Sequence, residues 1–154
     1  VGGQVVVSGD KAAVDRAVEI AKIRGAKRAM LLPVSAPFHC KLMQPAADAM
    51  AKALADVTIN KPAAPLVSNV LASPITDPGE IRRRLVEQVT GTVRWRESVS
   101  YMAGHGVTRF FEIGAGKVLS GLVKRIADGA VGVAVGGPDD VAPAKDAIAA
   151  TRSA

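Results

Sequence analysis

Short apolar segments alternate with amphipathic ones along this chain, and that alternation restricts its possible folds more than any other feature. Runs such as Val5–Val7, Phe110–Ile113 and Val131–Val135 have the length and apolar content of buried strands. Between such runs, apolar residues recur at helical spacing, as they do from Ala13 to Ala21 before Gly25. Strands that alternate with helices are typical of α/β proteins. The sequence therefore predicts an α/β fold with a largely parallel sheet.

The pattern gives a residue range for each expected element. Strands are expected over residues 1–7, 29–34, 65–70, 110–113 and 131–135. Helices are expected over residues 11–24, 45–57, 78–89, 95–105, 117–126 and 139–150. Asp77 and Glu80 have the spacing of a capping box at the start of the third helix.

Composition excludes several classes of protein. With 154 residues, 49% hydrophobic and 22% charged, the chain has the size and balance of one ordinary globular domain or of pieces of two small ones. No apolar stretch approaches the ~20 residues of a membrane span, so no membrane partner is expected. The single cysteine, Cys40, cannot form an internal disulfide, which suits a cytoplasmic location. The chain opens at Val1 within an expected strand and without a leader pattern, which predicts a piece of a longer protein.

The net charge of +6 favours an anionic partner without identifying it. Nucleic acid, a phosphorylated cofactor and an acidic protein all remain open. Only five aromatic residues are available to stack bases, and the basic clusters Lys27–Arg28 and Arg82–Arg84 stand far apart in the sequence. The charge is therefore weak support for nucleic-acid binding.

Common catalytic and ligand-binding motifs are absent from the sequence. At the turn Gly114–Lys117, Phe111 and Val118 occupy positions that a Walker A motif gives to glycine and to serine or threonine. Leu119 occupies the third glycine position of a dinucleotide-binding motif, so we interpret the turn as structural. The histidines and the cysteine lack the spacing of a zinc site, and no metal is expected. None of the eight serines lies in the G-x-S-x-G context of a nucleophile elbow.

His39 and Cys40 are neighbours in a loop that contains Pro37. Adjacent side chains usually point apart, so Cys40 is interpreted as a small buried residue and not as the nucleophile of a Cys/His pair. His39 follows an expected strand, and loops at the carboxyl ends of strands carry the chemistry of α/β proteins. Taken alone, one histidine favours a hydrogen-bonded structural residue.

Several segments, taken together and in order, resemble one family. They are Ala26–Ala29 (AKRA), Leu32–Cys40 (LPVSAPFHC), Leu42–Ala47 (LMQPAA), Val86–Val89 (VEQV), Val93–Trp95 (VRW) and Glu112–Leu119 (EIGAGKVL). The series closely resembles the C-terminal half of malonyl-CoA:acyl-carrier-protein transacylases of bacterial type II fatty acid synthesis. In that family a small ferredoxin-like subdomain is inserted in a large α/β-hydrolase-like subdomain. The resemblance implies that residues 1–34 are the closing strand, helix and strand of the small subdomain and that residues 35–154 are the C-terminal part of the large one.

The resemblance also implies a reaction and roles for particular residues. Enzymes of this family transfer a malonyl group from malonyl-CoA to the phosphopantetheine thiol of acyl carrier protein by a ping-pong mechanism, without a cofactor. His39 matches the family's general base, and Gln88 matches a residue whose backbone carbonyl orients that base. Phe38 matches a position that separates malonyl from branched acyl groups in related polyketide acyltransferases, and phenylalanine there favours malonyl. Lys27 and Arg28 match the rim of the cleft, where they would meet coenzyme A phosphates or the acidic carrier protein, a solvated basic pair being the alternative.

The serine nucleophile of this family is not expected in the chain. The resemblance implies that this serine, the arginine that binds the malonyl carboxylate and an oxyanion-hole residue lie in a missing N-terminal half. We therefore expect the isolated chain to be inactive, because a base without its nucleophile has nothing to activate. Two alternatives remain open: a catalytically silent basic module that binds acyl carrier protein or nucleic acid, and a hydrolase that uses Cys40.

Overall fold

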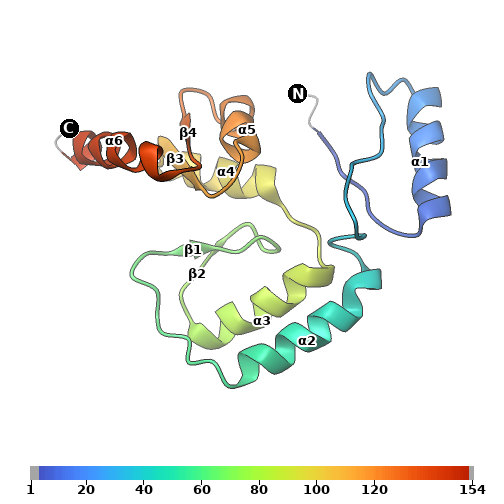
Figure 1. Ribbon diagram of the computed structural model, residues 1–154, viewed down its shortest axis with the longest axis horizontal. Coiled ribbons are helices and arrows are strands. Elements are labelled where there is room, and N and C mark those ends of the chain that lie inside the picture. Colours follow the sequence, from blue (N-terminus) through green and yellow to red (C-terminus); the bar gives the residue numbers. More distant parts are fainter. Residues whose placement is uncertain (1–3, 153–154) are drawn as a thin grey trace. The chain divides into compact units, whose positions relative to one another are not determined.

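The computed structural model describes residues 4–152 and has an α/β architecture (Figure 1). Its helices are α1 (Lys11–Ile23), α2 (Gln44–Ala55), α3 (Pro78–Thr90), α4 (Trp95–Gly104), α5 (Val118–Ile126) and α6 (Val141–Arg152), with the short 3-10 turns η1 (Lys41–Met43) and η2 (Pro138–Asp140). Its strands are β1 (Leu66–Val67), β2 (Pro74–Ile75), β3 (Arg109–Ile113) and β4 (Val131–Val135). The chain forms two compact units, and the first ends at Arg94 where the second begins at Trp95.

In the first unit, α2 and α3 pack side by side, and the antiparallel pair β1–β2 lies against α3 (Figure 1). Both helices have a proline in their first turn, where the missing N–H costs no hydrogen bond. Asp77 caps α3, because its Oδ1 accepts a hydrogen bond of 2.7 Å from the main-chain N–H of Glu80. The spacing of these two residues predicted this cap. Glu80 itself pairs with Arg83 and Arg84 on the next turn of the helix.

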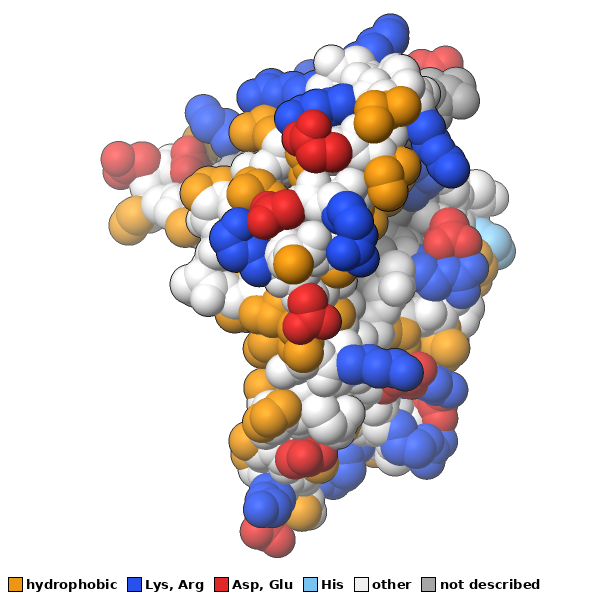
Figure 2. Space-filling model, turned by 90° about the vertical axis from the view of Figure 1, so that its right-hand side faces the viewer, with side chains coloured by type: hydrophobic (Ala, Val, Ile, Leu, Met, Phe, Trp, Pro, Cys, Tyr) orange, Lys and Arg blue, Asp and Glu red, His pale blue; other side chains and the backbone are white. Residues whose placement is uncertain are grey.

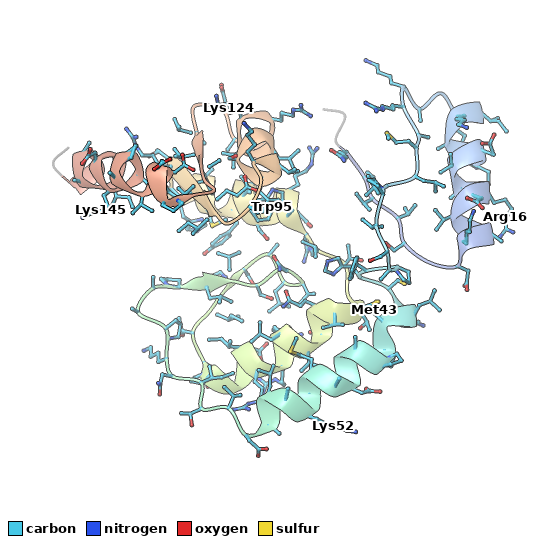
Figure 3. All side chains as sticks on the ribbon, viewed as in Figure 1. Arg16, Met43, Lys52, Trp95, Lys124 and Lys145 are labelled. Atoms are coloured by element: carbon cyan, nitrogen blue, oxygen red, sulfur yellow. The ribbon has the colours of Figure 1, made fainter. Side chains whose placement is uncertain are left out.

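In the second unit, β3 and β4 form a parallel pair, with Arg109 opposite Val131 and Ile113 opposite Val135. The connection between them passes through α5, as parallel strands require. Val99 of α4 and Val123 of α5 form the centre of the core, at 0% and 1% exposure. Aromatic and aliphatic neighbours, among them Trp95 at the start of α4 (labelled in Figure 3), pack against this centre: Trp95, Met102, Ala103, Phe110 and Ile126.

The two strands expected around α1 are not formed within the described residues. Residues 4–10 and 26–34 carry no strand assignment, and residues 1–3 of the first expected strand lie outside the described residues. A strand needs a neighbouring strand for its main-chain hydrogen bonds, and neither segment has one here. Their apolar side chains are exposed, Val5 at 82% and Val34 at 59%. The helix between them forms as expected, and Gly25, at φ 84°, ends it.

The strand expected over residues 65–70 is shorter, and its partner β2 was expected as loop. The chain reverses after Val67, because Ser68 donates its main-chain N–H to Ser73 O (3.0 Å) and Ala72 donates to Ser68 O (2.8 Å). Ala72 takes φ 54° within this turn, a value that alanine rarely adopts. The turn brings Pro74 and Ile75 of β2 back beside β1, so that a hairpin forms.

Candidate active site

His39 lies in a tight loop that leads into η1 and α2. Its φ of 62° falls in the left-handed region, which residues other than glycine rarely adopt. Main-chain hydrogen bonds of 3.0 Å close the loop on both sides, from Phe38 N to Ala36 O and from Met43 N to Cys40 O (Met43 is labelled in Figure 3). The surrounding bonds therefore hold His39 in a strained conformation, and such conformations cluster at functional sites.

Gln88 lies in the last turn of α3 and faces this loop with its main-chain oxygen. The carbonyl oxygens in the last turn of a helix have no partner within the helix, so they are open to other donors. His39 Nδ1 lies 2.8 Å from Gln88 O. A carbonyl oxygen can only accept, so Nδ1 donates its hydrogen, and in the neutral imidazole Nε2 is left as the basic nitrogen. The acceptor of this hydrogen bond is a main-chain oxygen, and a histidine in a catalytic triad makes the corresponding bond to a carboxylate.

The side chain of Gln88 has a second attachment. Asn69, in the turn after β1, donates from Nδ2 to Gln88 Oε1 over 2.8 Å. The main-chain N–H of Arg94 donates to Asn69 O over 2.8 Å, and the Arg94 guanidinium donates to Leu71 O over 3.1 Å. A cavity of about 230 Å³ lies between the hairpin and α3, lined by Leu66, Val67, Ser68, Asn69, Ile75, Ile81, Arg84, Leu85 and Gln88. The end of α3 is therefore tied to the turn after β1.

The other residues singled out from the sequence take no part in the hydrogen bond between His39 and Gln88. Phe38 precedes His39 in the loop and is 47% exposed. Lys27 and Arg28 follow α1 and are both exposed. Cys40 is half-buried, and its thiol donates to Pro37 O over 3.0 Å. Sequence reasoning missed Asn69, because an asparagine in a loop carries no signal that a distant helix end lies beside it.

The glycine-rich turn between β3 and α5 is capped from within the chain. Glu112, on β3, accepts hydrogen bonds from Leu119 N (3.1 Å) and Ser120 N (2.8 Å) in the first turn of α5. These hydrogen bonds hold the pKa of the Glu112 carboxyl below its ordinary value, and the bond from the main chain of Ser120 has the largest effect. Gly114 and Gly116 take φ 134° and 103°, which only glycine adopts readily. Two main-chain donors in the first turn of α5 are thus already used within the chain, in keeping with a structural turn.

The described residues hold no metal-binding cluster. Among residues 4–152, no group of three or more His, Cys, Asp or Glu side chains could hold a metal ion. The helices of this part of the chain all lack the combination of length and hydropathy that crossing a bilayer requires. On the face shown in Figure 2, Lys and Arg are interspersed with acidic and hydrophobic side chains.

The structure matches part of the solved structures of acyl-carrier-protein malonyltransferases. The crystal structure of acyl-carrier-protein S-malonyltransferase from Bartonella henselae matches with a TM-score of 0.84 and 49% identity, over 92% of this chain and 45% of that chain. A malonyl-transacylase solved in complex with a type II PKS acyl-carrier protein matches with a TM-score of 0.79 and 43% identity, over 85% of this chain and 42% of that chain. The α/β class expected from the sequence is confirmed.

The sequence relatives carry a matching name. Malonyl CoA-acyl carrier protein transacylase of Escherichia coli (strain K12) is 49% identical over 142 residues, which are 92% of this chain and 46% of that protein. The protein of that name in Bacillus subtilis (strain 168) is 44% identical over 139 residues, 90% of this chain and 44% of that protein. No family model matches the chain. The resemblance drawn from the sequence is confirmed: the chain is homologous to malonyl CoA-acyl carrier protein transacylases and spans about half the length of the curated relatives it matches.

Proposed function

We propose that this chain is the C-terminal part of a malonyl-CoA:acyl-carrier-protein S-malonyltransferase and that it supplies the general base, His39. The observation that carries the proposal is the 2.8 Å contact between His39 Nδ1 and Gln88 O. It fixes the imidazole so that Nε2 is the nitrogen that exchanges protons. The names of the homologues support malonyl transfer as the reaction.

The first half of the proposed reaction loads the enzyme. His39 Nε2 takes the proton of a serine hydroxyl that the N-terminal half supplies, and the serine oxygen attacks the thioester carbonyl of malonyl-CoA. The carbon–sulfur bond breaks, a malonyl ester forms on the serine, and the coenzyme A thiolate takes the proton back from the imidazolium. Gln88 O keeps its hydrogen bond with Nδ1 throughout, so it stabilises the positive charge on the ring.

The second half unloads the malonyl group. The phosphopantetheine thiol of acyl carrier protein gives its proton to His39 Nε2, and its sulfur attacks the malonyl ester. The bond to the serine oxygen breaks, and the imidazolium returns a proton to that oxygen. Both halves are proton and acyl transfers, so they balance without a cofactor.

The remaining sequence predictions have defined places in this proposal. Phe38, beside the base, would limit the space near C2 of the acyl group and so favour unbranched malonyl. Lys27 and Arg28 would meet coenzyme A phosphates or the carrier protein. Residues 1–34 would complete the small ferredoxin-like subdomain and residues 35–154 the large one, in a cytoplasmic enzyme. The exposed apolar segments before and after α1 support the need for a further part of the protein to cover them.

Complementation tests the proposal. The chain is mixed with the upstream half of the same enzyme, made as a separate polypeptide, and malonyl transfer from malonyl-CoA to holo acyl carrier protein is measured. We expect transfer from the mixture, none from either part alone, and none when the chain carries His39→Ala. A stable malonyl adduct on the chain alone would overturn the proposal, and its loss in Cys40→Ser would assign the nucleophile to Cys40. Carrier-protein binding that survives His39→Ala, with no transfer from the mixture, would favour the silent binding module.

A further inference from the structure

We infer that Asn69 is a positioning residue for His39 and acts through Gln88. The inference rests on the proposed function of His39 as the base. Gln88 accepts two hydrogen bonds of 2.8 Å, one at its main-chain oxygen from His39 Nδ1 and one at its side-chain oxygen from Asn69 Nδ2. Asn69 therefore fixes the residue that in turn fixes the imidazole.

The end of α3 needs such an anchor. The last turn of a helix frays, because its carbonyl groups lack helical partners and its main chain is free to rotate. Gln88 lines the cavity of about 230 Å³ between the hairpin and α3, so packing alone leaves its side chain room to move. A hydrogen bond to a fixed donor removes that freedom.

Asn69 is such a fixed donor. Its neighbour Ser68 is 3% exposed. The main-chain N–H of Ser68 donates to Ser73 O, and its main-chain oxygen accepts from Ala72 N. The main-chain oxygen of Asn69 accepts a hydrogen bond from Arg94 N over 2.8 Å. The side-chain amide therefore starts from a rigid backbone, and little entropy is lost when it holds Gln88.

The tautomer of His39 is the readout that a merely structural role would leave unchanged. A hydrogen bond from Nδ1 to a carbonyl favours the Nδ1–H tautomer, which ¹⁵N NMR of the imidazole distinguishes from the Nε2–H form. Asn69→Leu removes the donor and keeps a similar volume. Gln88→Met removes the side-chain acceptor and keeps the main-chain oxygen. Asn60→Leu, at an exposed asparagine of the same unit, is the matched control.

We expect the unchanged chain and Asn60→Leu to show mainly the Nδ1–H form at a pH where the ring is neutral. In Asn69→Leu and in Gln88→Met, the share of the Nε2–H form should rise several-fold. The double variant should show no more than either single one, because both changes break the same bond. An unchanged tautomer ratio in folded Asn69→Leu overturns the inference. If urea unfolding shows that Asn69→Leu does not fold, Gln88→Met is the deciding variant, because it leaves the turn untouched. A larger share of the Nε2–H form in Gln88→Met then supports the inference, and an unchanged tautomer ratio overturns it.

Activity separates this inference from the proposed function. In the complemented enzyme, Asn69→Leu should lower kcat about tenfold and leave KM for malonyl-CoA unchanged, because it impairs proton transfer and not substrate binding. A tautomer shift without any transfer activity in the unchanged mixture would contradict the proposed function and leave the Asn69–Gln88–His39 relation standing. Full kcat despite the tautomer shift would overturn the positioning role of Asn69.

Discussion

Gly91 lies so close to Val70 that a Cβ atom on Gly91 would be 3.0 Å from Val70 Cγ1. The same Cβ would be 2.9 Å from the main-chain oxygen of Glu87, which accepts the hydrogen bond of Gly91 N. Gly91→Ala should therefore push the end of α3 away from the turn after β1. We expect a loss of about 1–3 kcal/mol in the free energy of unfolding, as for overpacked cores, measured by urea denaturation.

The same substitution should disturb His39, the proposed general base. Because Glu87 precedes Gln88, displacement of its carbonyl moves the oxygen that holds His39. The Nε2–H tautomer of His39 should gain population in ¹⁵N spectra of Gly91→Ala. Gly9→Ala is the control, since a Cβ at Gly9 meets no atom within 4 Å. Equal stability of the two variants would show that Val70 and the end of α3 give way at no cost.

Two glycines of the second unit should respond in opposite directions. A Cβ on Gly132 of β4 would lie 2.3 Å from Ser120 O, a main-chain atom that cannot move unless α5 moves. A Cβ on Gly121 of α5 would meet nothing within 4 Å. Gly132→Ala should lower the free energy of unfolding by about 3 kcal/mol. Gly121→Ala should raise it by about 0.5–1 kcal/mol, because alanine restricts the unfolded chain. Denaturation of both variants, followed by the fluorescence of the single tryptophan, Trp95, measures the difference. A destabilised Gly121→Ala would contradict the geometry at α5.

Acid should weaken the cap of α5. The hydrogen bonds from Ser120 and Leu119 lower the pKa of Glu112 in the folded chain, so the folded chain keeps the carboxylate ionised where the unfolded chain takes up a proton. The stabilisation that this pKa difference gives to the folded chain is fully present above the pKa of Glu112 in the unfolded chain, about 4.3. It is lost as the pH falls through the lower pKa of Glu112 in the folded chain. The urea midpoint of the unchanged chain should therefore fall more steeply below about pH 4.3 than that of Glu112→Gln. Parallel pH curves would show that the cap contributes no linked stability. Glu80, whose pKa is lowered by Arg83 and Arg84, leaves a residual slope in both.

Local signals in the sequence predicted the elements that are stabilised locally. The Asp77 cap placed the start of α3, and the apolar run Val131–Val135 gave the bounds of β4. The expected strand over residues 29–34 was wrong because strand formation depends on a neighbouring strand, which a local pattern does not report. The hairpin was missed for a related reason, since it depends on Ala72 taking a positive φ.

The site shows the same division between local and distant information. The loop position of His39 was visible in the sequence, but its contact with Gln88 joins residues 49 positions apart. Periodicity and spacing contain nothing that pairs them, and only the family resemblance related the two. Neither the sequence pattern nor the family resemblance indicated Asn69, because its hydrogen bond to Gln88 forms only when the turn after β1 and the end of α3 meet in space.

Arg82 should stabilise the packing of α2 against α3 more than Arg83 does. The Arg82 guanidinium donates to Val57 O over 2.7 Å and to Ala55 O over 3.2 Å. Ala55 is the last residue of α2, so its main-chain oxygen has no partner within the helix, and Val57 follows shortly after the helix end. Among the described residues, Arg83 forms its ion pair within α3, with Glu80. Arg82→Ala should lower the free energy of unfolding by about 1 kcal/mol and speed hydrogen exchange in the last turn of α2. Arg83→Ala should change stability less and leave that exchange unaltered, because its partner lies on its own helix. Equal exchange rates in both variants would show that the end of α2 is held by packing alone.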